Sequence, residues 1–535
     1  MSATAASHGS ASRGSSLAPA DDWSRAWAQS FGARWYLDVA VMAVVVFCFG
    51  AVRPLSDPDL PMHLAVGEWI VRNGTVPFVE PFAWTRAGAP YYAYSWLQQV
   101  TYYEVLHQLG PWGLRALQGL LVLASAIAMV VLAHAAHWRP AQAVMLAASN
   151  LIVGSFFVGF LRPQSILLIT IPLIWAGAYR LTQGRGVLPA AIVMFLASAT
   201  TANSHLFFPL TLAPLALLWV NPPPRASARL VGVMSVVLGW LASPYALHWP
   251  EVFAHNFGAN ILTRPPSVVT ELQPGFVSML YPKPTAMLGV VALMLAIPWT
   301  LRRVDLRPRE LWLTAVYWIG GVVLFGYASR LFVAWWLLSL PAIGLAIVHL
   351  TRNSEEGPPR LPFRLLGLLS CAVIITTQLL KTGDQRAMEG DTEHRMLPTF
   401  AAAPAERLAA ALERDGAADR EGRMMSTFVF GSYLTWRLPS LSQSIDSRGV
   451  FPDSVAAAEA VVLASDRDVP VGPWRSADVA LVPLRYRVAA VLDTATGWRR
   501  LATTPGAPVV MDSVGLWVRR DWWAARGGST PAQPR

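Results

Sequence analysis

The sequence predicts a mainly α-helical polytopic membrane protein with about eleven transmembrane helices and a C-terminal α/β soluble domain outside the membrane. Composition is the first observation: 54% of the 535 residues are hydrophobic, 14% are charged, and the mean hydropathy is +0.41. A soluble domain usually carries about a quarter of charged residues. The second is a series of apolar runs that match the ~20 residues needed to cross a bilayer as a helix. The third is the return of polar residues after Lys381.

The net charge of +10 and the pI near 9.9 could suggest nucleic-acid binding. The arginines, however, gather in short loops between apolar runs, where they set topology and contact anionic headgroups of membrane lipids. We therefore expect membrane lipids and no nucleic acid among the partners. Cys48 and Cys371 both lie inside apolar segments, which argues against a disulfide framework or a thiolate metal cluster.

Three regions follow one another along the chain. Residues 1–35 are rich in Ser, Ala and Gly and are expected to form a disordered cytoplasmic tail. Residues 36–381 are expected to form the transmembrane domain, and residues 382–535 the exterior α/β domain. The apolar runs that predict membrane spans are 36–55, 113–134, 140–160, 163–181, 187–202, 205–220, 229–247, 285–301, 311–328, 331–350 and 362–380.

The distribution of arginine fixes the expected orientation. With the N-terminus inside, every inner loop carries arginine, as the positive-inside rule requires. These arginines are Arg139, Arg180, Arg185, Arg225, Arg229, Arg302, Arg303, Arg307, Arg309, Arg352 and Arg364. An odd number of spans then places the C-terminal domain outside, together with two large outer loops, 56–111 and 248–284.

The first outer loop has an amphipathic pattern. Apolar residues spaced for one helical face predict a short helix over 60–70 and a second over 94–109. In the C-terminal domain, strands alternate with helices, which predicts an α/β layer with strands at 427–430, 443–446, 479–483, 498–502, 509–512 and 516–519.

Two acids stand where the first span leaves the membrane. In Ser56-Asp57-Pro58-Asp59, the proline keeps Asp57 out of the helical region, and Asp59 is placed to cap the helix that begins near Leu60. A helix cap with a solvated aspartate therefore explains the motif equally well. His63 follows Asp59 by four residues on the same helical face, either as an ordinary polar residue or as a partner of an acid or metal.

Other polar residues at the edges of apolar runs fall on the same outer side under this topology. Taken singly, such an arginine is commonly an interface anchor. Taken together, arginines facing acids at one mouth describe a pocket for a phosphate-bearing lipid and a hydroxyl acceptor. These residues are Arg162, Gln164, Asn203, His205, Arg264, Glu271 and Arg330.

The motifs resemble those of GT-C-type membrane glycosyltransferases, and in particular a set of bacterial polytopic proteins whose first outer loop reads D-P-D-x-x-x-H-L-x-x-G. The order of the short motifs along most of the chain carries the resemblance. They are Asp57-Pro58-Asp59, His63-Leu64, Gly67, Gly74-Thr75-Val76-Pro77, Pro81-Phe82, Ser95-Trp96-Leu97, Arg162-Pro163-Gln164, Asn203-x-His205, Glu271-Leu272 in place of an E-W pair, Gly431-Ser432-Tyr433-Leu434 and Ile445-Asp446-Ser447-Arg448.

The resemblance implies an enzyme of the bacterial cytoplasmic membrane that moves a sugar from a polyprenyl-phosphate carrier to a hydroxyl of an envelope glycan, lipid or protein. By position, the general base is Asp57 first and Asp59 second, or these acids orient a divalent metal (Mg²⁺ or Mn²⁺). Arg162, Arg264 or Arg330 would neutralise the leaving phosphate, and direct displacement would invert the anomeric centre.

Supporting roles follow from position in the same way. Asn203 and His205 are expected to support the catalytic groups or to bind the acceptor, and Trp96 belongs to an aromatic group suited to stacking on a sugar. Two other functions stay open. One is a transporter or flippase of a lipid-linked envelope intermediate, which would favour internal repeats and broken helices. The other is a non-catalytic protein that binds or assembles envelope polymer.

Overall fold

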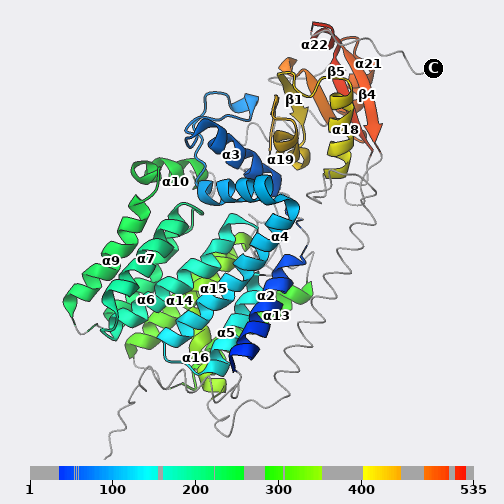
Figure 1. Ribbon diagram of the computed structural model, residues 1–535. Helices are drawn as coiled ribbons and strands as arrows, with labels where there is room; N and C mark the ends of the chain where they lie inside the picture. The colour runs from blue at the N-terminus through cyan, green and yellow to red at the C-terminus, as the bar shows by residue number, and fades with distance from the viewer. Residues whose placement is uncertain are drawn as a thin grey trace, which may run out of the picture.

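The described part of the chain is mostly helical, with one small sheet near its C-terminal end (Figure 1). The computed structural model describes residues 35–53, 55, 57, 59–154, 161–221, 223, 225–257, 284–304, 308–351, 402–446, 475–504 and 513–525. The predicted span at 362–380 lies outside these residues.

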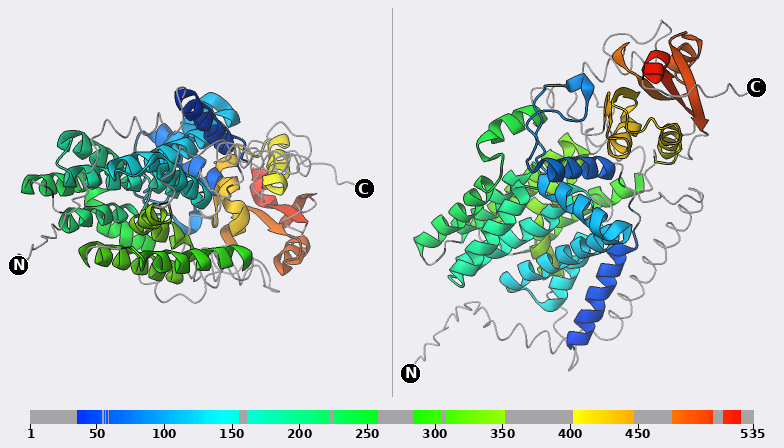
Figure 2. Two further views of the ribbon diagram at one scale, coloured as in Figure 1. Left: turned by 90° about the horizontal axis from the view of Figure 1, so that it is seen from below. Right: turned by 45° about the horizontal axis from the view of Figure 1, so that its top comes forward.

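Helices occupy the other ten predicted apolar runs. Most of them run alongside one another in a single layered bundle (Figures 1 and 2). They are α2 (Trp35–Ala51), the later part of α4 (Trp96–Ala135), α5 (Pro140–Val153), η3 (Pro163–Ile166) with α6 (Leu167–Thr182), α7 (Val187–Ala202), η4 (Phe208–Ala216) with α8 (Leu217–Val220), α9 (Ala226–Leu241), α13 (Pro284–Leu301), α14 (Pro308–Tyr327), η7 (Ser329–Leu331) with α15 (Phe332–Leu338), and α16 (Leu340–Leu350).

Length and composition identify three of the described helices as able to cross a membrane: Trp96–Ala135, Pro163–Thr182 and Pro308–Tyr327. The count rises to five if each of two bent pairs forms one span, namely α9 with the helical segment Ala246–Asn256, bent by 93°, and α15 with α16, bent by 57°. These helices indicate a membrane protein, and the number eleven stays a prediction.

Proline explains why two of the predicted spans are not single α-helices. The run 205–220 forms the 3₁₀-helix η4 before the short α8, because Pro209 and Pro214 lack the N–H that an α-helix needs. The run 331–350 breaks at Ser339, two residues before Pro341. Proline is favoured in the first turn of a helix and disfavoured in its interior, so Pro341 favours the start of a second helix at this point.

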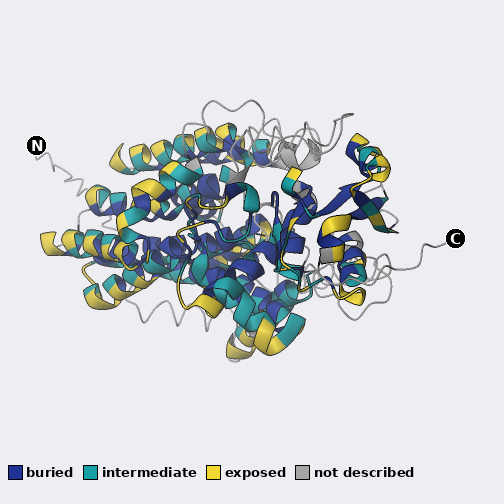
Figure 3. Ribbon diagram, turned by 90° about the horizontal axis from the view of Figure 1, so that it is seen from above, coloured by how far each residue is buried: buried dark blue, intermediate teal, exposed yellow. Residues whose placement is uncertain are grey.

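The bundle has a continuous apolar core and an apolar outer surface. Large side chains such as Trp175, Trp335 and Phe325 are buried inside it. On α14, Trp312 is 70% exposed and Val323 is 64% exposed. Figure 3 shows exposed residues along the outward sides of the helices and buried residues between them. Apolar side chains can be exposed in this way where lipid replaces water as solvent.

The segment 56–111, predicted to be the first outer loop, contains the two predicted helices; we keep the name first outer loop for it. The first is α3 (Leu60–Asn73), which ends at Gly74 in the left-handed conformation. The second is the early part of α4, and the later part of α4 is the predicted span 113–134. Between them Gly110 has φ 65° and ψ −166°, followed by Pro111, so the chain changes direction at that point.

Gly67 explains how closely α3 and α4 approach each other. A Cβ at this position would overlap the backbone carbonyl of Gln99 on α4. The glycine that ends the D-P-D-x-x-x-H-L-x-x-G motif therefore has a packing role: it lets α3 lie directly on α4.

The C-terminal domain contains a five-stranded sheet of order β2-β1-β3-β5-β4. Strands β2, β1 and β3 are parallel, and β5 and β4 are antiparallel. The elements are α18 (Ala402–Arg414), β1 (Gly422–Ser426), α19 (Phe428–Arg437), β2 (Leu441–Gln443), β3 (Val479–Pro483), α21 (Arg487–Thr494), β4 (Trp498–Thr504), β5 (Val514–Arg519) and α22 (Arg520–Ala525).

Three of the predicted strands, 479–483, 498–502 and 516–519, correspond to β3, β4 and β5. The strand predicted at 427–430 is wrong, because the strand is β1 and Thr427 is already the N-cap of α19. A short apolar run does not distinguish a strand from the first turn of a helix. The predicted strand 443–446 overlaps β2 only at its last residue, Gln443. The predicted strand 509–512 lies outside the described residues.

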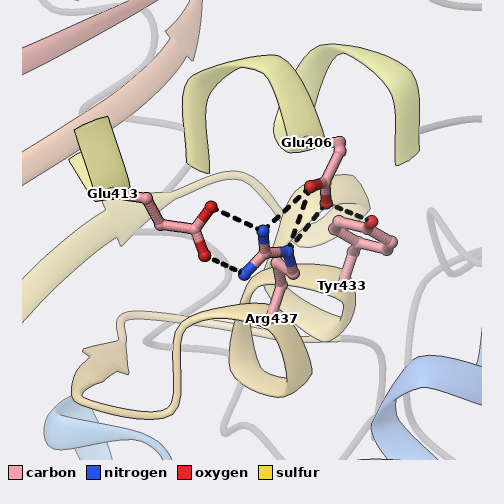
Figure 4. Close-up of polar contacts among 4 residues, drawn as sticks. All are labelled: Glu406, Glu413, Tyr433 and Arg437. Atoms are coloured by element: carbon pink, nitrogen blue, oxygen red, sulfur yellow. Dashed lines mark hydrogen bonds and ion pairs between the residues drawn. The ribbon is translucent and has the colours of Figure 1, made fainter. Parts of the chain in front are cut away.

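Ion pairs hold α18 against α19 (Figure 4). The guanidinium of Arg437 contacts both oxygens of Glu406 at 2.9–3.1 Å and both oxygens of Glu413 at 2.5 and 2.8 Å. The hydroxyl of Tyr433 donates to Glu406 at 2.7 Å. The hydrogen-bonded ion pair with Glu413 raises the pKa of Arg437, and burial lowers it. The pKa is raised overall. The arginine is charged at all ordinary pH values.

Candidate active site

Asp57 and Asp59 lie in the short connection between α2 and α3. The Oδ1 atom of Asp57 accepts a hydrogen bond from the backbone N–H of Asp59 at 2.9 Å, which fixes the turn into α3. Asp59 occupies the N-cap position, but its side chain makes no capping hydrogen bond. The predicted capping role of Asp59 is therefore wrong: Asp57 shapes the turn, and the carboxylate of Asp59 points elsewhere.

Arg162 lies opposite both acids. Its Nε donates to Oδ2 of Asp57 at 2.5 Å, and its Nη2 is 4.0 Å from Oδ2 of Asp59. The Asp57 and Arg162 side chains are 15% and 21% exposed, and that of Asp59 is 35% exposed. The carboxylates of Asp57 and Asp59 thus share the guanidinium of Arg162, which lies 105 residues after Asp57 in the sequence. We call Asp57, Asp59 and Arg162 the acid–arginine site.

Apolar side chains surround this site. Leu55, Leu60 and Leu161, which flank the acids and the arginine in sequence, are buried in one cluster with Leu64 and Tyr102. Such surroundings strengthen electrostatic interactions, because little water is present to screen them. The arrangement therefore suits chemistry in which charge is moved or stabilised.

His63 lies one turn into α3, beside the site. Its Nδ1 is 3.2 Å from Nε2 of Gln99, and its ring meets Tyr102 edge-on at 6.3 Å. Burial lowers the pKa of His63 to about 4; the charge of Asp57 raises it, and that of Arg162 lowers it further. The imidazole is therefore neutral near pH 7. With Gln99 donating to Nδ1, the proton resides on Nε2.

The sequence reasoning missed three polar residues at the start of α4. Gln98, Gln99 and Tyr102 are all at least 94% buried. The Tyr102 hydroxyl donates to Gln98 Oε1 at 2.9 Å, while Gln99 contacts His63. Two adjacent glutamines in a helix that is otherwise largely apolar were the available signal, because buried polar side chains need partners.

Asn203, His205 and Trp96 form a second polar group. Trp96 Nε1 donates to Asn203 Oδ1 at 2.7 Å, and Asn203 Nδ2 donates to the carbonyls of Ala199 and Ala242. His205 Nδ1 accepts from the N–H of Phe207. Asn203 and His205 are at most 6% exposed. These bonds join the start of α4 to the ends of α7 and α9, which is a structural role for Asn203 and for the indole N–H of Trp96.

The structure describes only some of the remaining predicted site residues. Gln164 lies in η3, two residues after Arg162, and is 9% exposed. Arg330 lies in η7 between α14 and α15, and only its backbone is described. Arg264 and Glu271 lie outside the described residues.

The acids do not form a metal site with the residues that are described. No group of three or more His, Cys, Asp or Glu side chains in the described part of the chain is arranged to hold a metal ion. The cation that faces Asp57 is the guanidinium of Arg162. Mg²⁺ is usually held by one or two carboxylates together with water and substrate phosphate, so a divalent ion on Asp57 and Asp59 stays a prediction.

Comparison with known proteins shows the fold. No protein-family model and no curated protein matches the chain. Among solved structures, that of the arabinofuranosyltransferase AftD from mycobacteria, an R1389S mutant, matches with a TM-score of 0.56 and 13% sequence identity. The match covers 92% of this chain and 42% of AftD, so the chain spans less than half the length of that protein. This likeness supports a GT-C-like fold.

Proposed function

We propose that this chain is a membrane glycosyltransferase that transfers a sugar from a polyprenyl-phosphate carrier to a hydroxyl acceptor. The observation that carries the proposal is the acid–arginine site: two carboxylates on one guanidinium, in an apolar setting, at the junction of α2 and α3. The similarity of fold to a protein named as an arabinofuranosyltransferase supports it.

The chemistry assigns a role to each charge. The acceptor O–H loses its proton to a carboxylate, its oxygen forms the new bond to the anomeric carbon, and the bond from that carbon to the phosphate oxygen breaks. The phosphate departs with the bonding electron pair, and Arg162 neutralises the charge. Attack from the face opposite the leaving phosphate inverts the anomeric centre.

Asp57 is the proposed base, with Asp59 second. In the absence of substrate both oxygens of Asp57 accept hydrogen bonds, one from the Asp59 N–H and one from Arg162. A phosphate that arrives at Arg162 competes for the guanidinium and frees Oδ2 of Asp57 for the acceptor proton. Asp59 is the more exposed acid and lies farther from the guanidinium, at 4.0 Å, and its substitution distinguishes the two assignments.

The test is transfer of sugar from polyprenyl-phosphate donors by the purified chain and its variants. Asp57→Asn should abolish transfer, Arg162→Gln should reduce it by roughly 100-fold or more, as for the loss of a group that stabilises transition-state charge, and Asp59→Asn should leave partial activity. Glu68→Gln is the matched control, because Glu68 forms a carboxylate–arginine pair within α3, at 2.6 Å from Arg72, whose side chain is 67% exposed.

Full activity of Asp57→Asn would remove the carboxylate mechanism. Loss of activity in Asp59→Asn alone would move the base to Asp59. Absence of transfer with every donor would favour the binding or transport alternatives. We further propose that the acceptor is an envelope glycan, lipid or protein and that the chain lies in the bacterial cytoplasmic membrane with its C-terminal domain outside. Mass spectrometry of envelope glycans from wild-type and deletion strains would identify the product.

A further inference from the structure

The first outer loop pairs with the sheet of the C-terminal domain. The Phe82 carbonyl accepts from the Gln443 N–H at 3.0 Å and from Ser442 Oγ at 2.7 Å, and Ala83 forms a parallel bridge with Gln443. Strand β2 is an edge of the sheet, so residues 82–83 act as a short additional strand. Within the loop, buried Glu80 accepts from the N–H groups of Phe82 and Ala83 and holds them in place.

The next two residues of the loop extend this contact. Trp84 Nε1 donates to the Met424 carbonyl at 3.2 Å, and the indole packs against a buried apolar cluster of the C-terminal domain. Thr85 Oγ1 donates to the Ser444 carbonyl at 2.5 Å. We call residues 82–85 the docking segment. An exposed sheet edge carries unpaired backbone groups, and the docking segment satisfies some of them at β2.

A second contact with the C-terminal domain lies where α19 packs against α3 (Figures 1 and 2). Trp436 of α19 packs against the buried apolar cluster that includes Leu55, Leu60 and Leu161, the leucines that flank the acid–arginine site in sequence. The next residue, Arg437, is held by Glu406 and Glu413 (Figure 4). The tryptophan is therefore presented to the site by a helix whose own position is fixed.

We propose that the C-terminal domain is a fixed wall of the acid–arginine site and that Trp436 is a positioning residue for the Asp57–Arg162 pair. A hinged lid would have to break the pairing at β2 and expose the Trp84 indole in every cycle. Trp436 excludes water from the apolar cluster that flanks Asp57 and Arg162. In this way it keeps the two charged side chains in hydrogen-bonding position. The kinetic part of this proposal rests on the proposed glycosyltransferase function, whereas the docking part does not.

Docking is tested by cutting the chain. A protease site inserted between residues 382 and 400 of the full chain is cleaved after purification through an N-terminal tag. The fragment that carries residues 402–525 should stay bound, and Trp84→Ala with Thr85→Val should release it. Arg519→Gln, which breaks an ion pair with Asp521 at the end of β5, is the control and should retain it. Release of the unsubstituted fragment, or full retention in the docking-segment variant, would overturn a docked wall.

Positioning is tested at Trp436. Trp436→Ala should lower kcat at least ten-fold with little change in KM and with the domain still docked, and Trp436→Phe should restore part of the rate. An unchanged kcat overturns the positioning role. If the unsubstituted chain transfers no sugar, the proposed function fails separately. A double-mutant cycle of Trp436→Ala and Asp57→Asn, measured by thermal unfolding, then decides whether Trp436 positions Asp57. Additive shifts in Tm would show that the two residues are not coupled and would overturn the positioning role.

Discussion

His63 should make the stability of the protein depend on pH. Burial lowers the pKa of His63 from its ordinary value of 6.5 to about 4. Because the folded-state pKa is the lower one, the unfolded chain takes up a proton below pH 6.5 that the folded chain refuses until about pH 4. Stability contributed by the neutral imidazole is therefore complete above pH 6.5 and is lost as the pH falls toward 4.

The size of the effect follows from the shift. A difference of roughly 2.5 pKa units corresponds to about 3.4 kcal/mol, at about 1.36 kcal/mol per unit. The His63 side chain is only partly shielded from solvent, so about 2 to 3 kcal/mol is a better upper figure. Most of the change falls between pH 6.5 and pH 4.

The variant His63→Gln removes the titrating group and can still accept a hydrogen bond from Gln99. We expect wild-type protein in detergent to lose stability between pH 7 and pH 5 by about 1 to 2 kcal/mol more than the variant, measured by thermal unfolding at each pH. His107→Gln removes an exposed histidine from α4 and is the control. Parallel stability curves for wild type and His63→Gln would refute the assignment of a buried neutral imidazole.

Three further changes test separate parts of the structure. In an unfolding cycle, Asp57→Asn and Arg162→Gln should be coupled by about 1 to 3 kcal/mol because both side chains are mostly buried, whereas additive effects would show that the pair is not formed. Gly67→Val should separate α3 from α4, because its Cβ would overlap the Gln99 carbonyl, and should cost about 1 to 3 kcal/mol or more of unfolding free energy. Arg437→Gln should leave its two glutamate partners facing each other and destabilise the C-terminal domain by roughly 1 to 3 kcal/mol; unchanged resistance of that domain to trypsin would contradict this.

Helices and strands that have a clear local sequence pattern were predicted correctly. Apolar runs located the helices, and amphipathic spacing located α3 and the start of α4. The break between the two parts of α4 falls at Gly110-Pro111, which are the residues best able to turn the chain. Strand β3 falls on its predicted residues because its apolar run is short and bounded on both sides.

The sequence did not specify which residues of distant segments come into contact. The sequence predicted a pocket in which arginines face Asp57 and Asp59, but it did not distinguish Arg162 from Arg264 or Arg330 as the partner of Asp57. The pairing of Ala83 with Gln443 depends on how two segments of irregular structure meet, and no periodicity reports this. The sequence motifs did not include Trp436. The motif residue Gly431 has a packing reason instead, since a Cβ there would overlap the Ile445 carbonyl.

The pairing between the first outer loop and the last domain also sets the order in which the protein can mature. Ser442 contacts Phe82 across 360 residues of chain. At a synthesis rate of roughly 5 to 20 residues per second, the loop waits on the order of 20 to 70 seconds for its partner. A chain that stops short of β2 therefore lacks the partner of the docking segment, so that this contact forms only after the helices of the bundle have been synthesised.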